Sequence, residues 1–476
     1  MLRILSALVY VGFVSSAFAA NPTPWSQFRG PAGTGVAAAD QKPPTKLGPD
    51  TNVKWKVDCP PGASSPVIAG NKLFLTAHDG DKLVTIAYSR ADGKELWRKV
   101  APAKEIEQYF KTEGSPAAST PVTDGERVVT YFGSCGLICY DLDGNELWKY
   151  ELPVALTNND FGTGSSPVLA DGMVILQRDQ RQDSKLLAID LKTGSKVWET
   201  KRDDKTSWST ACIWDTPGGK QVVVGGATKL KGYDLKTGAE KWSVNDLPAV
   251  PCTTPVVADG KLIFAAWAPG TGSGKGDIKM PTFDEVLDQA GEKEKGFLTK
   301  AGSEKTFLKG FFDSNDPNKD GKITREEWDA QLKFLASGKN RAVAVTPGGS
   351  GDISKTHVAW SIDSGLPYVP SPLVYDGIMY SVNMGGRLSA FDVKTGKAVY
   401  EAELVGLTNV YASPVAANGH IYLCGLDKAV VVIKAGELPQ KVTNTKLDDR
   451  IAATPAIADN VIYIRTNKTL YAFAEK

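Results

Sequence analysis

The sequence predicts an all-β protein, an eight-bladed β-propeller with a small α-helical insertion in blade five. The first observation is a unit that begins with Ser or Thr, usually followed by Pro, and occurs eight times. Apart from one long interruption, successive starts lie 41 to 55 residues apart. Repeats of this length with about four short strands are typical of propeller blades. The eight start residues are Ser65, Thr120, Ser166, Thr210, Thr254, Ser371, Ser413 and Thr454.

Within each unit the same order of strands and turns recurs. A polar turn such as residues 170–172 follows most starts, and an apolar strand such as residues 261–264 comes next. A second strand ends in Tyr-Asp-Leu or Ile-Asp-Leu, and the turn Lys-Thr-Gly leads into a closing strand. The closing strand carries an aromatic residue: Trp97, Trp148, Trp198, Trp242, Trp360 or, in the equivalent place, Tyr400.

The two ends of the chain indicate how the ring closes. The last unit, residues 453–473, has only three strands' worth of sequence. The missing strand with its Trp is present at the other end, as residues 53–57 around Trp55. A blade built from both termini hides edge strands that an open solenoid of hairpins would expose. We therefore expect one propeller formed by residues 52–267 and 340–476.

The first residues predict export. Residues 1–19 form a signal peptide with Arg3, an apolar stretch over residues 4–18, and small residues Ala17 and Ala19 at the cleavage site. Residues 20–51 are an N-terminal extension, and no Cys follows the cleavage site to carry a lipid. The mature protein is expected to be periplasmic or secreted, without a membrane anchor.

Composition and net charge limit the classes of partner that we expect. Charged residues make up 23% of the chain and the net charge is +1, so no field would attract nucleic acid. Six cysteines in an exported chain permit disulfides, but none has the Cys-x-x-Cys spacing of zinc or redox sites. Buried thiols that act as small apolar side chains are the simpler interpretation.

The interruption, residues 268–339, contains one motif with specific chemistry. Residues 316–327 match the twelve-residue calcium loop of an EF-hand. Calcium prefers oxygen ligands, which this loop supplies from side chains at its first, third, fifth and twelfth positions and from one carbonyl. The predicted calcium ligands are Asp316, Asn318, Asp320, the carbonyl of Lys322, and Glu327.

Sequence on both sides of this loop predicts helices. Phe307 and Phe311 are four residues apart before it, and an apolar series over residues 328–335 follows it. Upstream, Thr282 and Glu285 predict a capping box that starts another helix. A partner loop over residues 291–302 has lysines where acids belong, so it is not expected to bind metal.

The repeats resemble a known superfamily. The segments 193–198 and 237–242, each with Thr-Gly before Trp, look like repeats of pyrroloquinoline-quinone (PQQ) dehydrogenase-like propellers. Residues 25–31, Trp-Ser-Gln-Phe-Arg-Gly-Pro, are similar to the opening of exported PQQ-like repeat proteins. The resemblance implies the propeller fold over essentially the whole mature chain. It leaves activity open, because the superfamily includes quinone dehydrogenases and BamB-type outer-membrane assembly lipoproteins.

Catalytic motifs are scarce. The chain has three His, far apart, and no Gly-x-Ser-x-Gly elbow. Residues 270–276 imitate a phosphate loop but lack its first Gly and its Ser or Thr, so a flexible linker is the better interpretation. A PQQ enzyme often has adjacent cysteines, which this chain lacks. PQQ is therefore not expected, although a PQQ-dependent alcohol or sugar dehydrogenase is the alternative function.

The predicted function is that of a non-catalytic, exported binding or scaffold protein of the bacterial envelope, whose partner is a protein, peptide or glycan. Connections between blades gather at one mouth of a propeller channel, where loops on a rigid scaffold often bind ligands. The longest are residues 101–119, which include Glu113, and residues 151–164. The candidate ligand residues at this mouth are Tyr109, Asn158, Asp160, Arg178 and Asp179.

Overall fold

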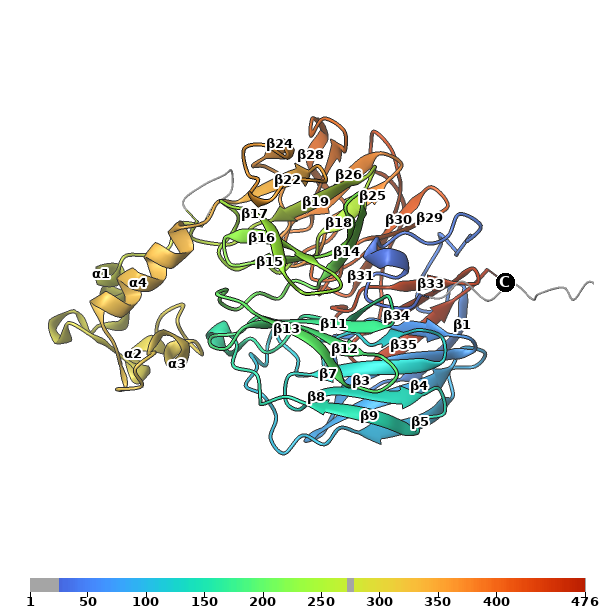
Figure 1. Cartoon of the computed structure of the whole chain (residues 1–476), viewed down its shortest axis with the longest axis horizontal. Coiled ribbons are helices and arrows are strands. Elements are labelled where there is room, and N and C mark those ends of the chain that lie inside the picture. The colour runs from blue at the N-terminus through green and yellow to red at the C-terminus, as the bar shows by residue number, and fades with distance from the viewer. Residues whose placement is uncertain (1–24, 272–277, 476) are drawn as a thin grey trace, which may run out of the picture.

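Eight β-sheets surround a central axis, and a group of helices projects from one side (Figure 1). The structure is a computed structural model that describes residues 25–271 and 278–475. The predicted signal peptide, residues 1–19, and most of the predicted linker 270–276 lie outside the described residues. The prediction of an all-β, eight-bladed propeller is confirmed.

Blades one to four each have four antiparallel strands that follow one another in sequence, and blade four has a fifth, parallel strand at its edge. The inner strands are short, in agreement with the short apolar segment after each start residue. Blade one contains β2 (Val67–Ala69), β3 (Lys72–Asp79), β4 (Lys82–Ser89) and β5 (Glu95–Val100), and blade two contains β6 (Val122–Thr123), β7 (Arg127–Phe132), β8 (Gly136–Asp141) and β9 (Glu146–Glu151). Blade three contains β10 (Val168–Ala170), β11 (Met173–Arg178), β12 (Lys185–Asp190) and β13 (Lys196–Lys201), and blade four contains β14 (Cys212–Thr216), β15 (Gly219–Gly226), β16 (Lys229–Asp234) and β17 (Glu240–Val244).

Blades five to eight complete the ring. In blade five the helices lie between the second and third strands, and β23 (Gly351–Asp352) joins the edge of blade four beside β17. Blade five contains β18 (Val256–Ala258), β19 (Lys261–Ala266), β22 (Arg341–Val345) and β24 (Val358–Ile362), and blade six contains β25 (Leu373–Tyr375), β26 (Ile378–Val382), β27 (Arg387–Asp392) and β28 (Ala398–Leu404). Blade seven contains β29 (Val415–Ala417), β30 (His420–Cys424), β31 (Ala429–Lys434) and β32 (Gln440–Lys446), and blade eight contains β33 (Ala456–Ala458), β34 (Val461–Arg465), β35 (Thr469–Phe473) and β1 (Val53–Asp58).

Blade eight is assembled from both ends of the chain, as predicted. Strand β1 pairs antiparallel with β35, and the ring of Trp55 lies 5.9 Å from that of Tyr463 in β34. The buried guanidinium of Arg465 joins this blade to blade one by donating hydrogen bonds to the carbonyls of Ser64 and Thr76. The first and last blades are therefore joined both by strand pairing and by buried polar contacts.

Most of the repeated Trp residues dock onto the next blade. The indole N–H of Trp148, for example, donates a hydrogen bond of 2.9 Å to the carbonyl of Leu191 in blade three. The indole also covers Gly194 of the Lys-Thr-Gly turn, where an added Cβ would lie 2.7 Å from the ring, and φ is +72°. Glycine is favoured there because it tolerates both the positive φ and the close approach. The Trp and Gly of the sequence repeat are thus the two halves of one contact between blades.

The described part of the projecting segment contains four helices. They are α1 (Phe283–Ala290), α2 (Lys300–Ser303), α3 (Phe312–Asn315) and α4 (Arg325–Ala336), with a 3-10 turn η3 (Lys293–Lys295) and a pair of two-residue strands, β20 (Leu298–Thr299) and β21 (Lys322–Ile323). The predicted capping box of Thr282 and Glu285 is present at the start of α1. The side chains of Phe283, Val286, Leu298, Ile323 and Trp328 belong to a separate apolar core.

One expectation about this segment is wrong. Phe307 and Phe311 do not lie on a helix that enters the loop, because residues 304–311 form turns and only α3 is helical. Gly310 has φ of +81°, which an α-helix does not accommodate, so the helical spacing of the two Phe residues does not become a helix.

All six cysteines lie within the described residues, and none forms a disulfide. Four of them are buried, which agrees with the interpretation as small apolar side chains. Among the described residues, no helix is both long enough and apolar enough to cross a membrane.

Candidate functional site

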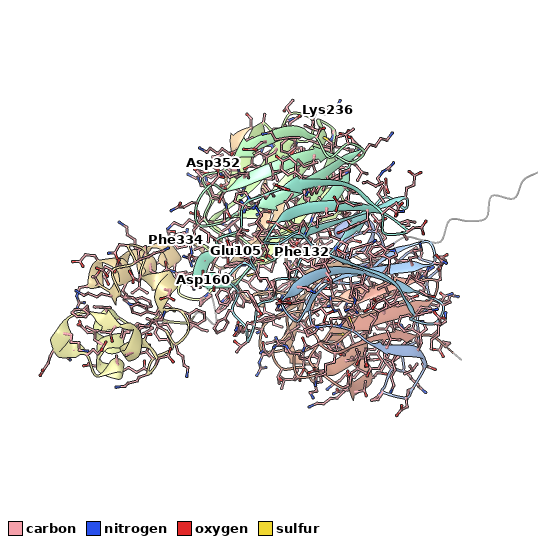
Figure 2. All side chains as sticks on the ribbon, turned by 90° about the horizontal axis from the view of Figure 1, so that it is seen from below. Glu105, Phe132, Asp160, Lys236, Phe334 and Asp352 are labelled. Carbon is pink, nitrogen blue, oxygen red and sulfur yellow. The ribbon has the colours of Figure 1, made fainter. Side chains whose placement is uncertain are left out.

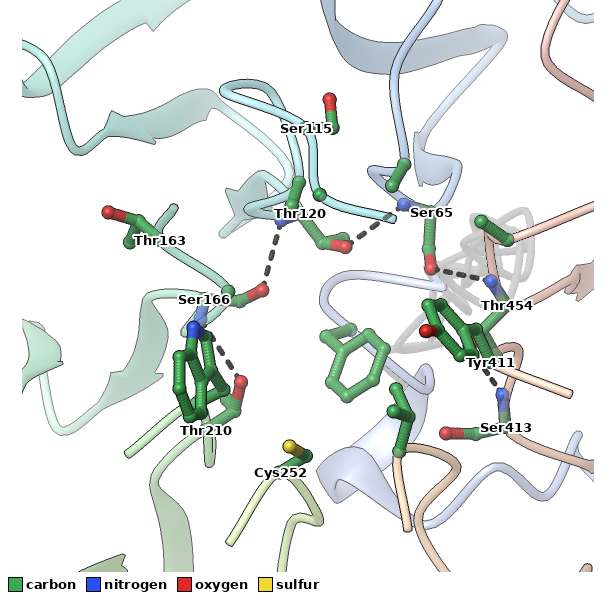
Figure 3. Close-up of a pocket in the computed structure, with 18 of the residues that line it drawn as sticks. Ser65, Ser115, Thr120, Thr163, Ser166, Thr210, Cys252, Tyr411, Ser413 and Thr454 are labelled. Atoms are coloured by element: carbon green, nitrogen blue, oxygen red, sulfur yellow. Dashed lines mark hydrogen bonds between the residues drawn. The ribbon is translucent and has the colours of Figure 1, made fainter. Parts of the chain in front are cut away.

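A closed ring of hydroxyl groups surrounds the central axis. The backbone N–H of each repeat-start residue donates a hydrogen bond to the side-chain oxygen of the start residue in the following blade, at 2.9 to 3.3 Å. Several of these bonds are drawn in Figure 3. Each start residue is buried, and an unmatched buried N–H is costly, so every position needs Ser or Thr. The ring explains why the repeat begins as it does.

A central cavity of about 190 Å³ lies against this ring. Most of its remaining wall comes from the connections that link the outer strand of one blade to the inner strand of the next. These connections contribute Glu113, Phe161, Trp208, Cys252, Tyr368, Tyr411 and Ala452, among others. The expectation that such connections gather at one mouth of the channel agrees with this placement.

The N-terminal extension separates this cavity from a second one. Phe28 lines both, together with Thr210 and Thr254 of the hydroxyl ring. The extension is held by backbone hydrogen bonds to blades one, two and seven, such as Ile68 N–H to the Trp25 carbonyl at 2.9 Å. The second cavity is about 300 Å³. Phe28 therefore forms a partition across the channel.

Aromatic side chains dominate the wall of the central cavity. Phe28, Phe161, Trp208, Tyr368 and Tyr411 are each half-buried, so part of each ring remains open to the cavity. The hydroxyl of Tyr411 donates a hydrogen bond of 2.7 Å to the carboxylate of Glu113. The sequence offered a signal for this wall, because Trp208, Tyr368 and Tyr411 stand two or three residues before a repeat start.

The five predicted ligand residues are not among those that line the central cavity. Tyr109 packs edge-on against His78, with ring centroids 5.9 Å apart. Asn158 and Asp160 lie on a 3-10 turn, η2 (Asn158–Asp160), and the Asp160 carboxylate pairs with Arg181 at 2.7 Å. Tyr109 and Asp160 thus have other partners, although residues 113–115 and 161–164 of the same two loops line the cavity.

Arg178 and Asp179 are buried inside blade three. Arg178 donates a hydrogen bond to the Pro153 carbonyl, and Asp179 accepts two from Arg202, at 2.7 and 3.0 Å. Both side chains of the Asp179–Arg202 pair are fully buried. The two residues line a void of about 10 Å³ between blades, room for a single water molecule.

A buried carboxylate beside that void has a raised pKa. Burial raises the pKa of Glu107 to about 7, although hydrogen bonds from the hydroxyl and backbone N–H of Thr163 favour the charged form. Sequence reasoning did not single out this residue, since nothing local distinguishes it from the exposed acids around it.

The predicted calcium loop is curled on its own backbone. The Asp316 carboxylate, 4% exposed, accepts hydrogen bonds from the N–H groups of Asp320 and Gly321. Asn318 and Asp320 accept from N–H groups within the same loop. Gly321 has φ of +82°, as the tight turn requires. The alternating oxygen-bearing side chains have the chemistry that calcium prefers.

Glu327 has a different partner in this structure. Its carboxylate accepts hydrogen bonds from the backbone N–H and hydroxyl of Thr324, at 2.9 and 3.0 Å, in a capping box at the start of α4. Over the described ranges, no three His, Cys, Asp or Glu side chains are gathered as a metal site would need. The oxygen donors of this loop have the chemistry that calcium prefers. To bind the ion, the Glu327 carboxylate would have to turn away from Thr324.

The helical segment contacts the mouth of the cavity through aromatic rings. Phe311 lies 4.7 Å from Phe110 and 5.6 Å from Phe161, between ring centroids. Ser314 accepts a hydrogen bond from Arg181, the partner of Asp160. Figure 2 shows Asp160 and Phe334 where the segment meets the propeller.

The sequence matches a family model described as outer membrane protein assembly factor BamB, over residues 80–266 and 316–475. The chain belongs to this family. The unmatched stretch between the two ranges holds most of the helical segment. The sequence matches no curated protein.

Solved structures share the BamB-type fold. BamB from Moraxella catarrhalis is 14% identical with a TM-score of 0.51, covering 92% of this chain and 98% of its own. A europium-containing methanol dehydrogenase is 10% identical with a TM-score of 0.54, and the match covers 96% of this chain and 99% of the dehydrogenase. A quinohemoprotein alcohol dehydrogenase from Pseudomonas putida HK5 is 12% identical with a TM-score of 0.56, and the match covers 95% of this chain and 80% of the dehydrogenase. These likenesses establish the fold, which serves both kinds of protein.

The lining of the central cavity was compared with the needs of PQQ. PQQ carries carboxylate groups, which in a buried site require cationic or hydrogen-bonding partners. No Lys, Arg or His is among the residues that line the cavity, and its one acidic residue is Glu113. The lining of this BamB-family cavity therefore offers no cationic partner for the carboxylates of PQQ.

Proposed function

We propose that this chain is a non-catalytic, exported β-propeller of the bacterial envelope that acts as a binding or scaffold protein. The observation that carries the proposal is the central cavity, whose wall is aromatic and hydroxylic and includes none of the three His residues. The family description, an outer membrane assembly factor, supports a role with other envelope components. The proposed partner is an envelope protein, peptide or glycan held by the loops at the mouth.

The main experiment adds PQQ and calcium to the purified protein and follows dye reduction with simple alcohols and aldose sugars. We expect no turnover that depends on PQQ. A PQQ-dependent alcohol or sugar dehydrogenase is the competing function, which the dehydrogenase neighbours favour. Robust dye reduction that stops when PQQ is withheld would establish that function instead.

We also propose that residues 316–327 bind calcium. Asp316, Asn318 and Asp320, the carbonyl of Lys322, and Glu327 would hold the ion, which would supply a fixed positive charge that stiffens the loop. Binding would compete with the capping box, because the Glu327 carboxylate cannot fully serve both Thr324 and the ion. Extracellular calcium modules bind in the range of about 10⁻⁴ to 10⁻³ M, and we expect an affinity in this range.

Calorimetric titration of the full mature chain with calcium tests this site. Glu327→Gln should lose most of the binding because it removes a ligand charge. Glu326→Gln is the matched control, since Glu326 is exposed and absent from the predicted ligand set. Equal calcium affinity in the two variants would refute the ligand assignment.

A further inference from the structure

We propose that the central cavity binds a small organic cation, an alkylammonium group enclosed by aromatic rings and paired with Glu113. The assignment rests on the proposed binding role and names the chemistry of the ligand. It uses the cavity alone and does not depend on calcium.

The aromatic wall supplies the first part of the argument. Ring faces attract cations through their quadrupole, and the attraction is stronger where the cation is desolvated. The rings are held in place: the Trp208 indole N–H donates a 2.7 Å hydrogen bond to the Gly162 carbonyl. Phe161 stands perpendicular to Trp208, with centroids 5.8 Å apart. Since each is half-buried, a ligand can reach the rings without a rearrangement of the wall.

The charges of the lining supply the second part. Glu113 is exposed, so its carboxylate lies where the cavity opens to solvent. One of its oxygens accepts the hydrogen bond from Tyr411, and no partner within residues 25–271 or 278–475 is bonded to the other. Arg450, the nearby cation, is outside the lining and donates a hydrogen bond to the Thr112 carbonyl. A ligand cation would therefore meet a carboxylate with no competing basic side chain in the wall.

The size of the cavity limits the ligand. About 190 Å³ is less than the roughly 300 to 1,000 Å³ of most drug-sized pockets, so the site suits a single small head group. The fitting ligands are a free quaternary amine or the end of a lysine side chain.

The experiment uses the full mature chain and measures binding by calorimetry and Trp fluorescence at matched ionic strength. The probes are choline, its uncharged isostere 3,3-dimethyl-1-butanol, N-acetyl-lysine methylamide and glucose. We expect one of the two cations to bind in a saturable manner, about tenfold or more tightly than the isostere. The preferred cation then identifies the source as a free amine or a lysine side chain.

Two variants locate the site. Glu113→Gln and Trp208→Leu should each weaken cation binding about tenfold, and Glu113→Gln should leave the affinity for the isostere unchanged. Glu105→Gln, an exposed acid on the same connection but outside the lining, is the control and should bind like the unmodified chain. Thermal unfolding checks that each variant is folded.

Equal binding of choline and its isostere, preferential binding of glucose, no binding of either cation, or no effect of Glu113→Gln would each overturn the cation assignment. None of these results would produce PQQ-dependent turnover, so failure of this inference is distinguishable from failure of the proposed non-catalytic role.

Discussion

The backbone N–H of Thr454 in blade eight donates a hydrogen bond of 3.1 Å to the hydroxyl of Ser65 in blade one. The two residues are the last and first repeat starts, so this bond closes the hydroxyl ring. Both residues are buried, so loss of the hydroxyl would take from the buried N–H its partner in the protein.

Replacing Ser65 should weaken the closed ring. Ser65→Ala leaves the Thr454 N–H buried without an acceptor, which costs roughly 1–3 kcal/mol of unfolding free energy. Ser65→Thr keeps the hydroxyl and should cost clearly less. Denaturant unfolding of both variants gives the comparison, and equal stability of Ser65→Ala and the unmodified chain would mean that the hydroxyl ring contributes nothing to closure.

Removal of the strand from the N-terminus should destabilise all blades together. Deletion of residues 22–58 leaves β35 with an unpaired edge and removes the contact between Trp55 and Tyr463. We expect a lower midpoint of thermal unfolding across the whole propeller. An unchanged midpoint would contradict the closure of the ring through β1.

Calcium should change the helical segment and little else. With calcium, residues from about 282 to 337 should gain protection from hydrogen exchange, while the blades keep theirs because their cores are built from the repeats. Exchange measured with calcium and with a chelator tests this. Changes spread evenly over the blades, or absent from residues 316–327, would refute it.

The contact between the helical segment and the propeller should depend on one ring. Phe311→Ala removes the packing against Phe110 and Phe161, so hydrogen exchange should increase in residues 158–161 and 310–315. Phe307→Ala is the matched control, because Phe307 is largely exposed and packs against Trp328 within the segment. The proposed anchor is wrong if the two variants loosen residues 158–161 equally.

Glu107 should make stability depend on pH. Its pKa is about 7 in the folded chain and near 4.5 when unfolded, so the folded state binds more protons between these values. The contribution of Glu107 to the free energy of unfolding is therefore fully present below about pH 4.5 and is lost as the pH rises to about 7. The loss is roughly 3 kcal/mol at most. Glu107→Gln should flatten that part of the stability curve, and denaturant unfolding between pH 4.5 and 8 tests it. A decline of the same size in both proteins would assign the effect to other groups.

Much of the fold was predictable because its signals are local. The Ser or Thr starts, the Trp-bearing strands and the split last repeat each occupy a few consecutive residues, and their regular spacing predicted the blades. The motif that predicts a calcium loop is local in the same sense, and calcium binding there stays a prediction. The helix expected around Phe307 and Phe311 does not form. Gly310, with its positive φ, interrupts the helical backbone between residues whose spacing suggested a helix.

The sequence by itself determined the closed ring and the position of the insertion, since repeats and strand patterns carry their own spacing. Only the tertiary structure decided which side chains meet at the centre. Glu113 and Tyr411 are 298 residues apart and bond across the mouth, while Arg178, at the end of β11, and Asp179, directly after it, turn into the blade. Sequence spacing cannot predict such contacts, because the closure of the ring and the path of each connection set the distance between residues from different blades.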